Sequence, residues 1–292
     1  MYAAYFSLRE MPFSITPDSS FFYPHEGIQA ALNTLLIALR TGEGFIKIVG
    51  EVGCGKTVLC RHLLKTLEDE CVTAYIPHPD MGPDDLLMAL VHELAIEVPP
   101  PLSRHKVLNA LRDGLLQHAQ ARRRVVICID EAQAMPIRTL ERLRLLSNLE
   151  TEKQKLLQIV LLGQPELDVS LAKPEIRQLL QRITFSEYLG PMRAERVPAY
   201  LAHRLSVSAL SESTDTDLFE AKAAEEIARY SRGVPRLVNV LAHKCLILAY
   251  GENTHRVNVA HVRQAGADTP GVWTQGSWWR GWQTGRPSGE VK

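Results

Sequence analysis

The chain has 292 residues, 46% of them hydrophobic, and its 33 basic residues are balanced by 33 acidic ones. A chain of this length can bury one large core or two modest ones without disulfide support. The balanced charge argues against a protein dedicated to nucleic acid, which would ordinarily be strongly basic. No apolar run of about 18 residues could span a bilayer, and the first residues lack the pattern of a secretory signal. We therefore expect a cytoplasmic protein, at most peripheral on the inner membrane.

The cysteines are scattered and form neither a CxxC pair nor a spacing typical of metal sites. They are Cys54, Cys60, Cys71, Cys128 and Cys245. We interpret them as reduced thiols of a cytosolic protein.

In the first two thirds of the chain, short apolar runs alternate with segments of helical periodicity. Strands are predicted at 45–49, 71–76, 124–129, 156–162 and 183–189. Helices are predicted at 56–68, 85–96, 103–120, 136–149 and 174–181. Such alternation predicts an α/β domain with a doubly wound parallel sheet.

The pattern changes after Gly190-Pro191, where only helical periodicity continues. Helices are predicted at 193–209, 218–231, 234–249 and 258–265. We therefore expect an N-terminal segment plus α/β domain at 1–191 and an all-helical lid domain at 192–267.

The remainder, 268–292, is rich in glycine and contains all four tryptophans, at Trp273, Trp278, Trp279 and Trp282. Its weak periodicity favours a disordered tail. The alternative is contact of the indoles with a membrane or a partner.

The stretch IVGEVGCGKT at 48–57 lies between a predicted strand and a predicted helix. Gly50, Gly55, Lys56 and Thr57 fit the pattern GxxxxGK[ST], in which backbone N–H groups surround a β-phosphate and the lysine neutralises β/γ charge. The following helix adds its positive amino end. The residues predicted to bind ATP are Gly50, Glu51, Val52, Gly53, Cys54, Gly55, Lys56, Thr57 and Asp130, with Thr57 and Asp130 also binding Mg²⁺.

Two carboxylates, Asp130 and Glu131, follow the apolar run RVVICI. Alone, such a pair is often a solvated turn, but beside a phosphate loop it predicts hydrolysis. Asp130 would contact Mg²⁺ directly or through water, and Glu131 would be the base that activates the attacking water. In chain order, the strand 71–76 comes between the loop strand and this acidic strand. That order suits the ATPases whose catalytic glutamate adjoins the acidic residue, and disfavours a metabolic kinase or a small GTPase.

Three further side chains are candidates for contacts with the γ-phosphate. Gln164 follows the strand 156–162 and would touch the phosphate or the water; the alternative is a turn residue before a helix. Arg236 opens a helix of the second domain, against the helix dipole, which favours a ligand role. Arg182, or as second choice Arg177, would be an arginine finger for a neighbouring subunit. A solvated helix face is an equally good interpretation of both.

Several segments together resemble the AAA+ ATPases of the ExeA/GspA type, and within it the MshM-like members of the MSHA type IV pilus system. They are MPFSITPDSSFFYP, GEVGCGKT, ICIDEAQAM, LRLLSNLET, LLQIVLLGQPEL, LLQRITF and SRGVPRLVNVLAHKCLILAY, and the resemblance spans residues 1–265. It implies an ATP-dependent homo-oligomer that supports assembly of a type IV pilus or type II secretion machinery with inner-membrane proteins. It also implies that Pro12-Phe13 and residues 23–26 pack near the adenine.

The chain departs from the family at two points. Cys54 stands where threonine is common, at a position where mainly the backbone matters, so we expect binding to survive. ExeA-like proteins continue into a membrane helix and a peptidoglycan-binding domain, whereas this sequence does not, which favours a pilus role over cell-wall remodelling. The alternative function is a DNA-associated AAA+ regulator of the transposition or origin-recognition kind, which the neutral charge disfavours.

Overall fold

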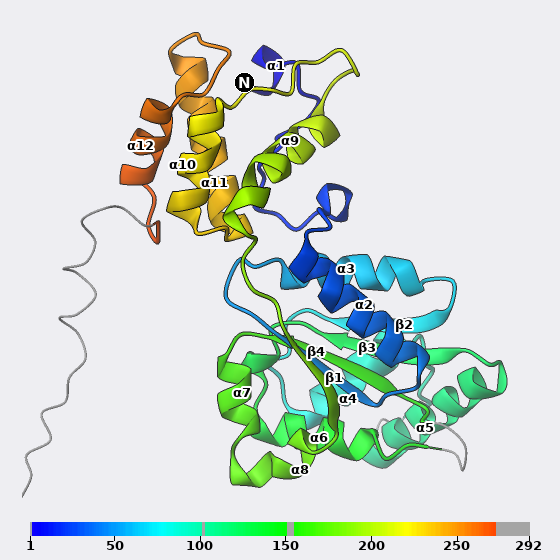
Figure 1. Cartoon of the computed structure of the whole chain (residues 1–292). Helices are drawn as coiled ribbons and strands as arrows, with labels where there is room; N and C mark the ends of the chain where they lie inside the picture. The colour runs from blue at the N-terminus through cyan, green and yellow to red at the C-terminus, as the bar shows by residue number, and fades with distance from the viewer. Residues whose placement is uncertain (1, 101–102, 151–154, 273–292) are drawn as a thin grey trace, which may run out of the picture. The chain divides into compact units, whose positions relative to one another are not determined.

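The computed structural model describes residues 2–100, 103–150 and 155–272. These residues form two compact units (Figure 1). One is Pro17–Gly190, and the other combines the described residues up to Thr16 with those from Pro191 onward. The expected boundary near residue 191 lies beside the observed one, but the first sixteen residues belong with the helical unit and not with the α/β unit.

The unit Pro17–Gly190 contains a five-stranded sheet in the order β2-β3-β4-β1-β5, with every pairing parallel. The strands are β1 Phe45–Val49, β2 Cys71–Ile76, β3 Arg124–Ile129, β4 Gln158–Gly163 and β5 Ile183–Tyr188. The predicted doubly wound α/β fold is confirmed. In the sheet β4 separates the loop strand β1 from the acidic strand β3, whereas β2, which comes between them in chain order, lies at the edge.

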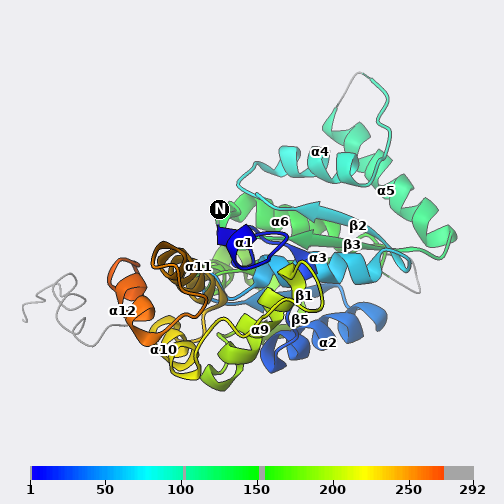
Figure 2. The ribbon, with the colours of Figure 1, turned by 90° about the horizontal axis from the view of Figure 1, so that it is seen from above.

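Helices cover both faces of this sheet (Figure 2). Helices α2 Glu26–Arg40 and α3 Lys56–Leu67 pack on the face that presents Ile46, Ile48 and Val160. The other face carries α4 Pro83–Glu93, α5 Arg104–Gln120, α6 Ile137–Leu146, α7 Glu166–Leu171 and α8 Arg177–Leu180. Successive strand residues alternate between the two cores, as Phe45 and Ile46 do, because side chains along a strand point to opposite faces.

Some boundaries differ from expectation. Strand β4 begins at Gln158 and not at residue 156, because its ladder with β3 starts at the pair Val126 and Gln158. The buried side-chain amide of Gln158 donates to the carbonyls of Leu39 and Glu43 at 3.0 and 2.9 Å. The predicted helix 174–181 is a short 3-10 turn followed by α8. Helix α2 was not predicted, although Ile28, Leu32, Leu35 and Leu39 are all buried on one side of it.

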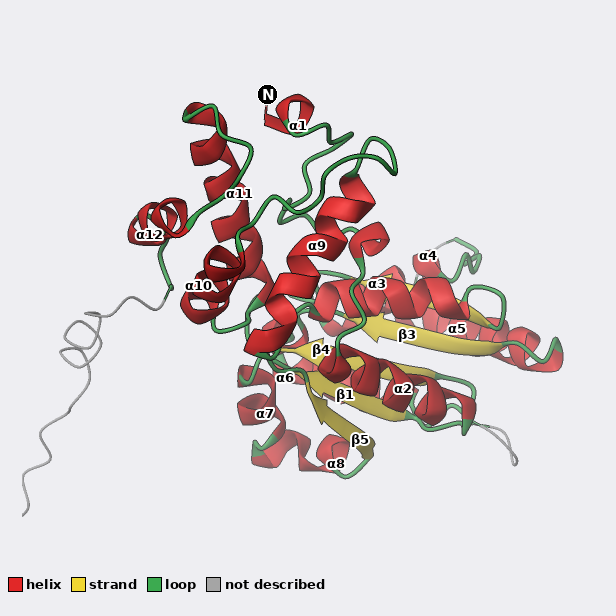
Figure 3. Cartoon of the chain, turned by 45° about the horizontal axis from the view of Figure 1, so that its top comes forward, coloured by secondary structure: helices red, strands yellow, loops and turns green. Residues whose placement is uncertain are grey.

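Among the described residues of the second unit there are four main helices, drawn as red ribbons in Figure 3. They are α9 Val197–Ser208, α10 Ala221–Ser231, α11 Pro235–Gly251 and α12 Val259–Ala267. Helix α9 begins later than the predicted residue 193, because a 3-10 turn occupies Ala194–Arg196. The predicted all-helical character of this part holds among its described residues.

The N-terminal segment, which begins with the short helix α1 Tyr2–Tyr5, is part of this helical unit. The Tyr2 hydroxyl lies 2.8 Å from Nδ1 of His243, and the backbone N–H of Arg9 donates to the Ser208 carbonyl at 2.8 Å. Buried Arg204 donates to the carbonyls of Pro12 and Ser14. Tyr2, Phe6 and Phe13 of this segment are buried, and Phe13 packs edge-on against Phe219 of the same unit.

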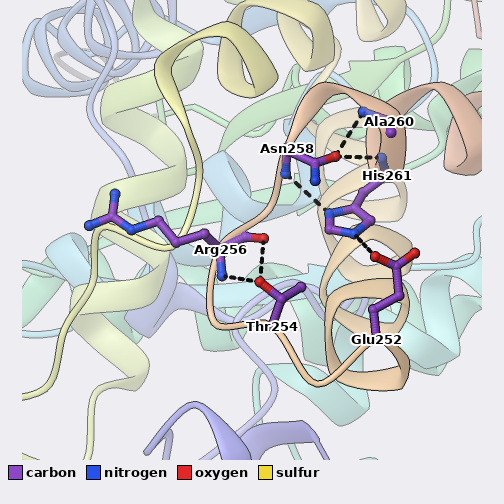
Figure 4. Close-up of polar contacts among 6 residues, drawn as sticks. All are labelled: Glu252, Thr254, Arg256, Asn258, Ala260 and His261. Carbon is purple, nitrogen blue, oxygen red and sulfur yellow. Dashed lines mark hydrogen bonds and ion pairs between the residues drawn. The ribbon is translucent and has the colours of Figure 1, made fainter.

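Side-chain capping fixes the start of α12 (Figure 4). The Asn258 side chain accepts hydrogen bonds from the N–H groups of Ala260 and His261 at 2.9 and 3.2 Å. The buried imidazole of His261 accepts from the Asn258 N–H and bonds Glu252 through Nε2 at 2.9 Å. This capping box satisfies amide groups that a helix start leaves without partners.

No helix in the described ranges is both long and apolar enough to cross a bilayer. The five cysteines are all buried and unpaired. Residues 273–292, which include all four tryptophans, lie outside the described residues, so the expectation for the tail remains a prediction.

Candidate active site

The predicted phosphate loop connects β1 to α3. Gly53 and Gly55 have φ of +82° and +96°, a left-handed conformation that favours glycine. A Cβ on Gly50 would lie 2.4 Å from the Leu189 carbonyl oxygen, so this position excludes any side chain. The glycines thus allow a tight turn that leads into the amino end of α3, where backbone N–H groups can bind an anion.

Cys54 lies inside this loop, and its side chain belongs to the hydrophobic core. Its side chain is fully buried in the core beneath α2 and α3. Burial raises the pKa of its thiol, so it stays neutral. Cys54 therefore contributes its side chain to core packing and only its backbone to the loop surface.

Lys56 is the first residue of α3 and is 5% exposed. Its Nζ donates to the carbonyls of Gly50 and Glu51 at 2.7 and 3.0 Å. An ammonium group has three donors, so one remains for an anion inside the loop. The carbonyls of Gly50 and Glu51 therefore already orient the Lys56 side chain within the loop.

Thr57 and Asp130 are brought together by the structure. The Thr57 hydroxyl donates to Oδ2 of Asp130 at 2.6 Å, and the N–H of Glu131 donates to Oδ1 at 2.9 Å. Tyr75, whose pKa is raised by burial and by this carboxylate, lies 3.4 Å from Oδ2. Adjacent hydroxyl and carboxylate oxygens are the ligands Mg²⁺ prefers, and the ion usually takes its remaining ligands from water and substrate phosphates. These residues therefore fit a magnesium ion.

Glu131 and Gln164 also meet, at the carboxyl ends of β3 and β4. Nε2 of Gln164 donates to Oε2 of Glu131 at 3.0 Å. Glu131 has φ of +51° and ψ of +37°, an uncommon backbone conformation for a residue with a side chain. Strain of this kind concentrates at functional sites.

Gln133 is a member of the site to which the sequence analysis assigned no role. Its Nε2 donates to Oε2 of Glu131 at 2.5 Å, and its Oε1 accepts from the N–H of Gln164 at 3.0 Å. The only signal in the sequence was its place in the segment IDEAQ, two residues after the glutamate. The role of Gln133 could not be predicted from its position alone, because it depends on the turn formed by the left-handed backbone of Glu131.

The sequence matches the AAA domain family over residues 39–171, a range that contains the phosphate loop and the Asp130–Glu131 pair. Residues 39–171 are thus similar to the AAA domain family. The glycine loop, the acidic residues and Gln164 follow β1, β3 and β4, which are neighbours in a parallel sheet, so all three lie at the carboxyl ends of the strands.

The match to the AAA domain family lies within a longer region of similarity. The chain is 38% identical over 281 residues to General secretion pathway protein A of Aeromonas hydrophila, which covers 96% of this chain and 51% of the relative. It thus spans about half the length of that relative. The predicted resemblance to the ExeA/GspA type is confirmed, and the MshM-like assignment is not tested.

Solved structures share the AAA+ fold at low sequence identity. The ORC2 protein of Aeropyrum pernix, solved with ADPNP and ADP, matches with a TM-score of 0.67 and 16% identity, over 91% of this chain and 73% of that one. The RuvB branch migration motor of Thermotoga maritima matches with a TM-score of 0.54 and 19% identity, over 82% and 67%. At such identities the likeness shows the fold alone.

Arg182, the first finger candidate, lies at the opposite end of β1 from the phosphate loop. Arg182 immediately precedes β5, whose first residue pairs with the first residue of β1, whereas the loop follows the last residue of β1. Its Nη1 donates to the Ser147 hydroxyl at 2.7 Å. Arg177 is exposed at the start of α8. Because Arg182 lies near the start of β1 and the loop follows the end of β1, a role for Arg182 as an arginine finger would act on another chain.

Arg236 is exposed at the start of α11 in the helical unit. The preceding turn is rigid, because Gly233 has φ of +74° and its carbonyl accepts from the Met192 N–H at 2.9 Å. The contact of Arg236 with a γ-phosphate stays a prediction.

The two segments expected near adenine have different surroundings. Phe13 is 1% exposed and packs edge-on against Phe219 in the helical unit. The start of α2 instead lies beside the phosphate loop, since Cδ1 of Ile28 is 3.7 Å from the position of a Cβ on Gly55. One turn earlier, His25 is 7% exposed, its Nε2 has no hydrogen-bond partner among the described residues, and burial lowers its pKa.

Proposed function

We propose that the protein binds ATP with Mg²⁺ and hydrolyses it, using Glu131 as the general base. The observation that carries this proposal is that two pairs of side chains form hydrogen bonds at the carboxyl ends of the sheet's strands. Thr57 and Asp130 share a hydrogen bond on the metal side, and Gln164 and Glu131 share one on the water side.

Each group has a distinct part in the proposed reaction. Magnesium, held by Thr57 and Asp130, would polarise the β- and γ-phosphates, and Lys56 would bind their oxygens. Glu131 would orient the attacking water and accept its proton through Oε1, since Oε2 already accepts amide N–H groups. Gln164 would contact the γ-phosphate or the attacking water, and Arg236 of the helical unit would contact the γ-phosphate.

We further propose that the nucleotide state governs association with other copies of the chain and with inner-membrane proteins of a type II secretion or type IV pilus assembly machinery. Similarity to General secretion pathway protein A over 96% of the chain supports the secretion assignment. The MSHA-like pilus assignment rests on the sequence resemblance.

The alternative is a DNA-associated regulator. It draws support from the AAA+ fold shared with the ORC1 protein of Aeropyrum pernix in complex with DNA, at a TM-score of 0.63 and 20% identity. The balanced charge of 33 basic and 33 acidic residues disfavours it. Stimulation of turnover by DNA that weakens steeply with salt would favour the alternative.

The decisive variant is Glu131→Gln, which keeps the shape of the side chain and removes the base. We expect nucleotide affinity close to that of the wild type and a turnover lowered on the order of 100-fold or more. Calorimetry measures the affinity and phosphate release measures the turnover. Wild-type turnover would remove Glu131 as the base.

The same variant tests the biological assignment, because it should persist in its ATP-bound state. Partners captured with it from inner-membrane extracts are expected to include secretion or pilus components. Recovery of DNA or transposition proteins in their place would support the alternative.

A further inference from the structure

We propose that Gln133 is a positioning residue that aligns the Glu131 carboxylate and couples it to the end of β4. This inference rests on the proposed function, since it assigns the residue a part in the same hydrolytic site. Gln133 lies in the 3-10 turn Ala132–Ala134 that follows Glu131. The turn is anchored in the core, because Ala132 is fully buried and Met135 is 4% exposed. The Gln133 side chain therefore starts from a fixed backbone.

The contacts of Gln133 use both ends of its amide. Oε1 accepts from the Gln164 N–H at 3.0 Å, and Nε2 donates to Oε2 of Glu131 at 2.5 Å. The backbone N–H of Gln164 can only donate, and an ionised carboxylate can only accept. The orientation of the amide is thereby determined by its partners. Replacing Gln133 by glutamate would remove the N–H donor to Glu131, and replacing it by leucine would remove both hydrogen bonds. Asparagine has the same amide on a side chain that is one methylene shorter.

We call the two hydrogen bonds of the Gln133 amide, to Glu131 and to Gln164, the Gln133 bridge. The neighbouring backbone leaves room for this bridge. A Cβ on Gly163 would lie 3.2 Å from Oε1 of Gln133 and 2.8 Å from Cδ2 of Leu167. Glycine at the last position of β4 therefore lets the amide reach the Gln164 N–H. The bridge joins β3 and β4 at the point where each strand ends.

The bridge has a consequence for catalysis. Oε2 of Glu131 accepts from two amides, those of Gln133 and Gln164. Its direction is thus held from two sides, which leaves Oε1 for a water molecule. A base that is misplaced by about 1 Å can lose on the order of 100-fold in rate. We therefore expect Gln133 to affect turnover through Glu131 and not through nucleotide binding.

The test is a double-mutant cycle with Gln133→Leu and Glu131→Gln in the full chain. We expect Gln133→Leu to lower kcat on the order of 10-fold to 100-fold, with ATP affinity by calorimetry changed less than about 3-fold. In the Glu131→Gln background, Gln133→Leu should lower the residual rate less than about 3-fold, because no base is left to align. Gln117→Leu, at an exposed position of α5, is the matched control and should leave kcat unchanged.

The outcomes separate this inference from the proposed function. An unchanged kcat in Gln133→Leu, or an equal loss of rate in both backgrounds, would overturn the positioning role while Glu131 keeps its own. Wild-type turnover in Glu131→Gln, or no turnover in the wild-type protein, would overturn the proposed function and this inference with it. Thermal melts of the variants distinguish a fall in kcat from unfolding. Gln133→Glu supplies a second variant, which keeps the acceptor, loses the donor and should also lower kcat.

Discussion

Lys56 illustrates how a single side chain can be prepared for a ligand by its own loop. Its Nζ is held by two carbonyls of the loop, and the side chain is almost entirely buried. The entropy of ordering this long side chain, on the order of 1.5–2 kcal/mol, is thus lost on folding. Binding a phosphate then requires little further ordering.

We predict that Lys56→Ala weakens ATP binding by about 10-fold to 100-fold, since hydrogen bonds to charged groups contribute about 1.5–3 kcal/mol. Isothermal calorimetry measures the change. Lys65→Ala, an exposed lysine at the end of the same helix, is the control and should bind as the wild type does. Undiminished affinity in Lys56→Ala would contradict the assignment of the phosphate loop.

Site residues differ in how far the sequence alone could locate them. The pattern GxxxxGK[ST] has a fixed spacing, so Lys56 and Thr57 were predictable within one segment. Gln133 was not, because its direction depends on the left-handed backbone of Glu131 and on the glycine at 163. Both are properties of the turn that no local pattern of polar residues reveals.

At the scale of elements, the buried strands were the easiest to predict. The runs FIKIV and RVVICI coincide with β1 and β3, because continuous apolar residues are typical of the centre of a parallel sheet. Helix α2 was missed, and its start lacks the usual signal, since His25 at its N-cap makes no side-chain hydrogen bond to the helix. The packing of the N-terminal segment on the helical unit could not be predicted, because it joins residues that are far apart in the chain.

The turn between α10 and α11 is the element most sensitive to a single methyl group. A Cβ on Gly233 would lie 1.9 Å from the Met192 carbonyl oxygen, and its φ of +74° disfavours other residues. We predict that Gly233→Ala destabilises the protein by more than about 1 kcal/mol. Chemical denaturation followed by circular dichroism measures this.

Gly251 offers a matched comparison in the neighbouring helix. It is the last residue of α11, and a Cβ there would meet nothing within 4 Å. Gly251→Ala should therefore be neutral or stabilise by up to about 1 kcal/mol. Equal effects of the two substitutions would show that the close approach at Gly233 is relaxed by a backbone shift.

At the scale of the whole molecule, the arginine-finger candidates can be tested by comparing associated protein with monomers. We predict that Arg182→Ala lowers turnover per chain by at least about 10-fold in concentrated, associated protein. This is a smaller effect than the loss of about 1,000-fold or more expected when a known arginine finger is removed. Dilute monomers should be unaffected. Phosphate release measured over a range of protein concentrations gives both values.

Arg177→Ala is the companion variant, since Arg177 is exposed whereas Arg182 already bonds Ser147. An equal loss for Arg182→Ala at monomeric dilution would refute a role in trans and indicate a structural one. A concentration-dependent loss confined to Arg177→Ala would assign the finger to that residue.

The helical unit is assembled from both ends of the sequence, and this has a consequence during synthesis. The N-terminal segment leaves the ribosome first, but α9 and α11, which cover it, follow only after the residues of Pro17–Gly190. The end of α11, at Gly251, follows Thr16 by 235 residues, so at about 5–20 residues per second the delay is roughly 10 to 50 s. Throughout this interval Tyr2, Phe6 and Phe13, all buried in the finished protein, have no native surface to pack against. The nascent chain therefore presents an aromatic hydrophobic segment, a recognisable substrate for chaperones, until α9 and α11 emerge.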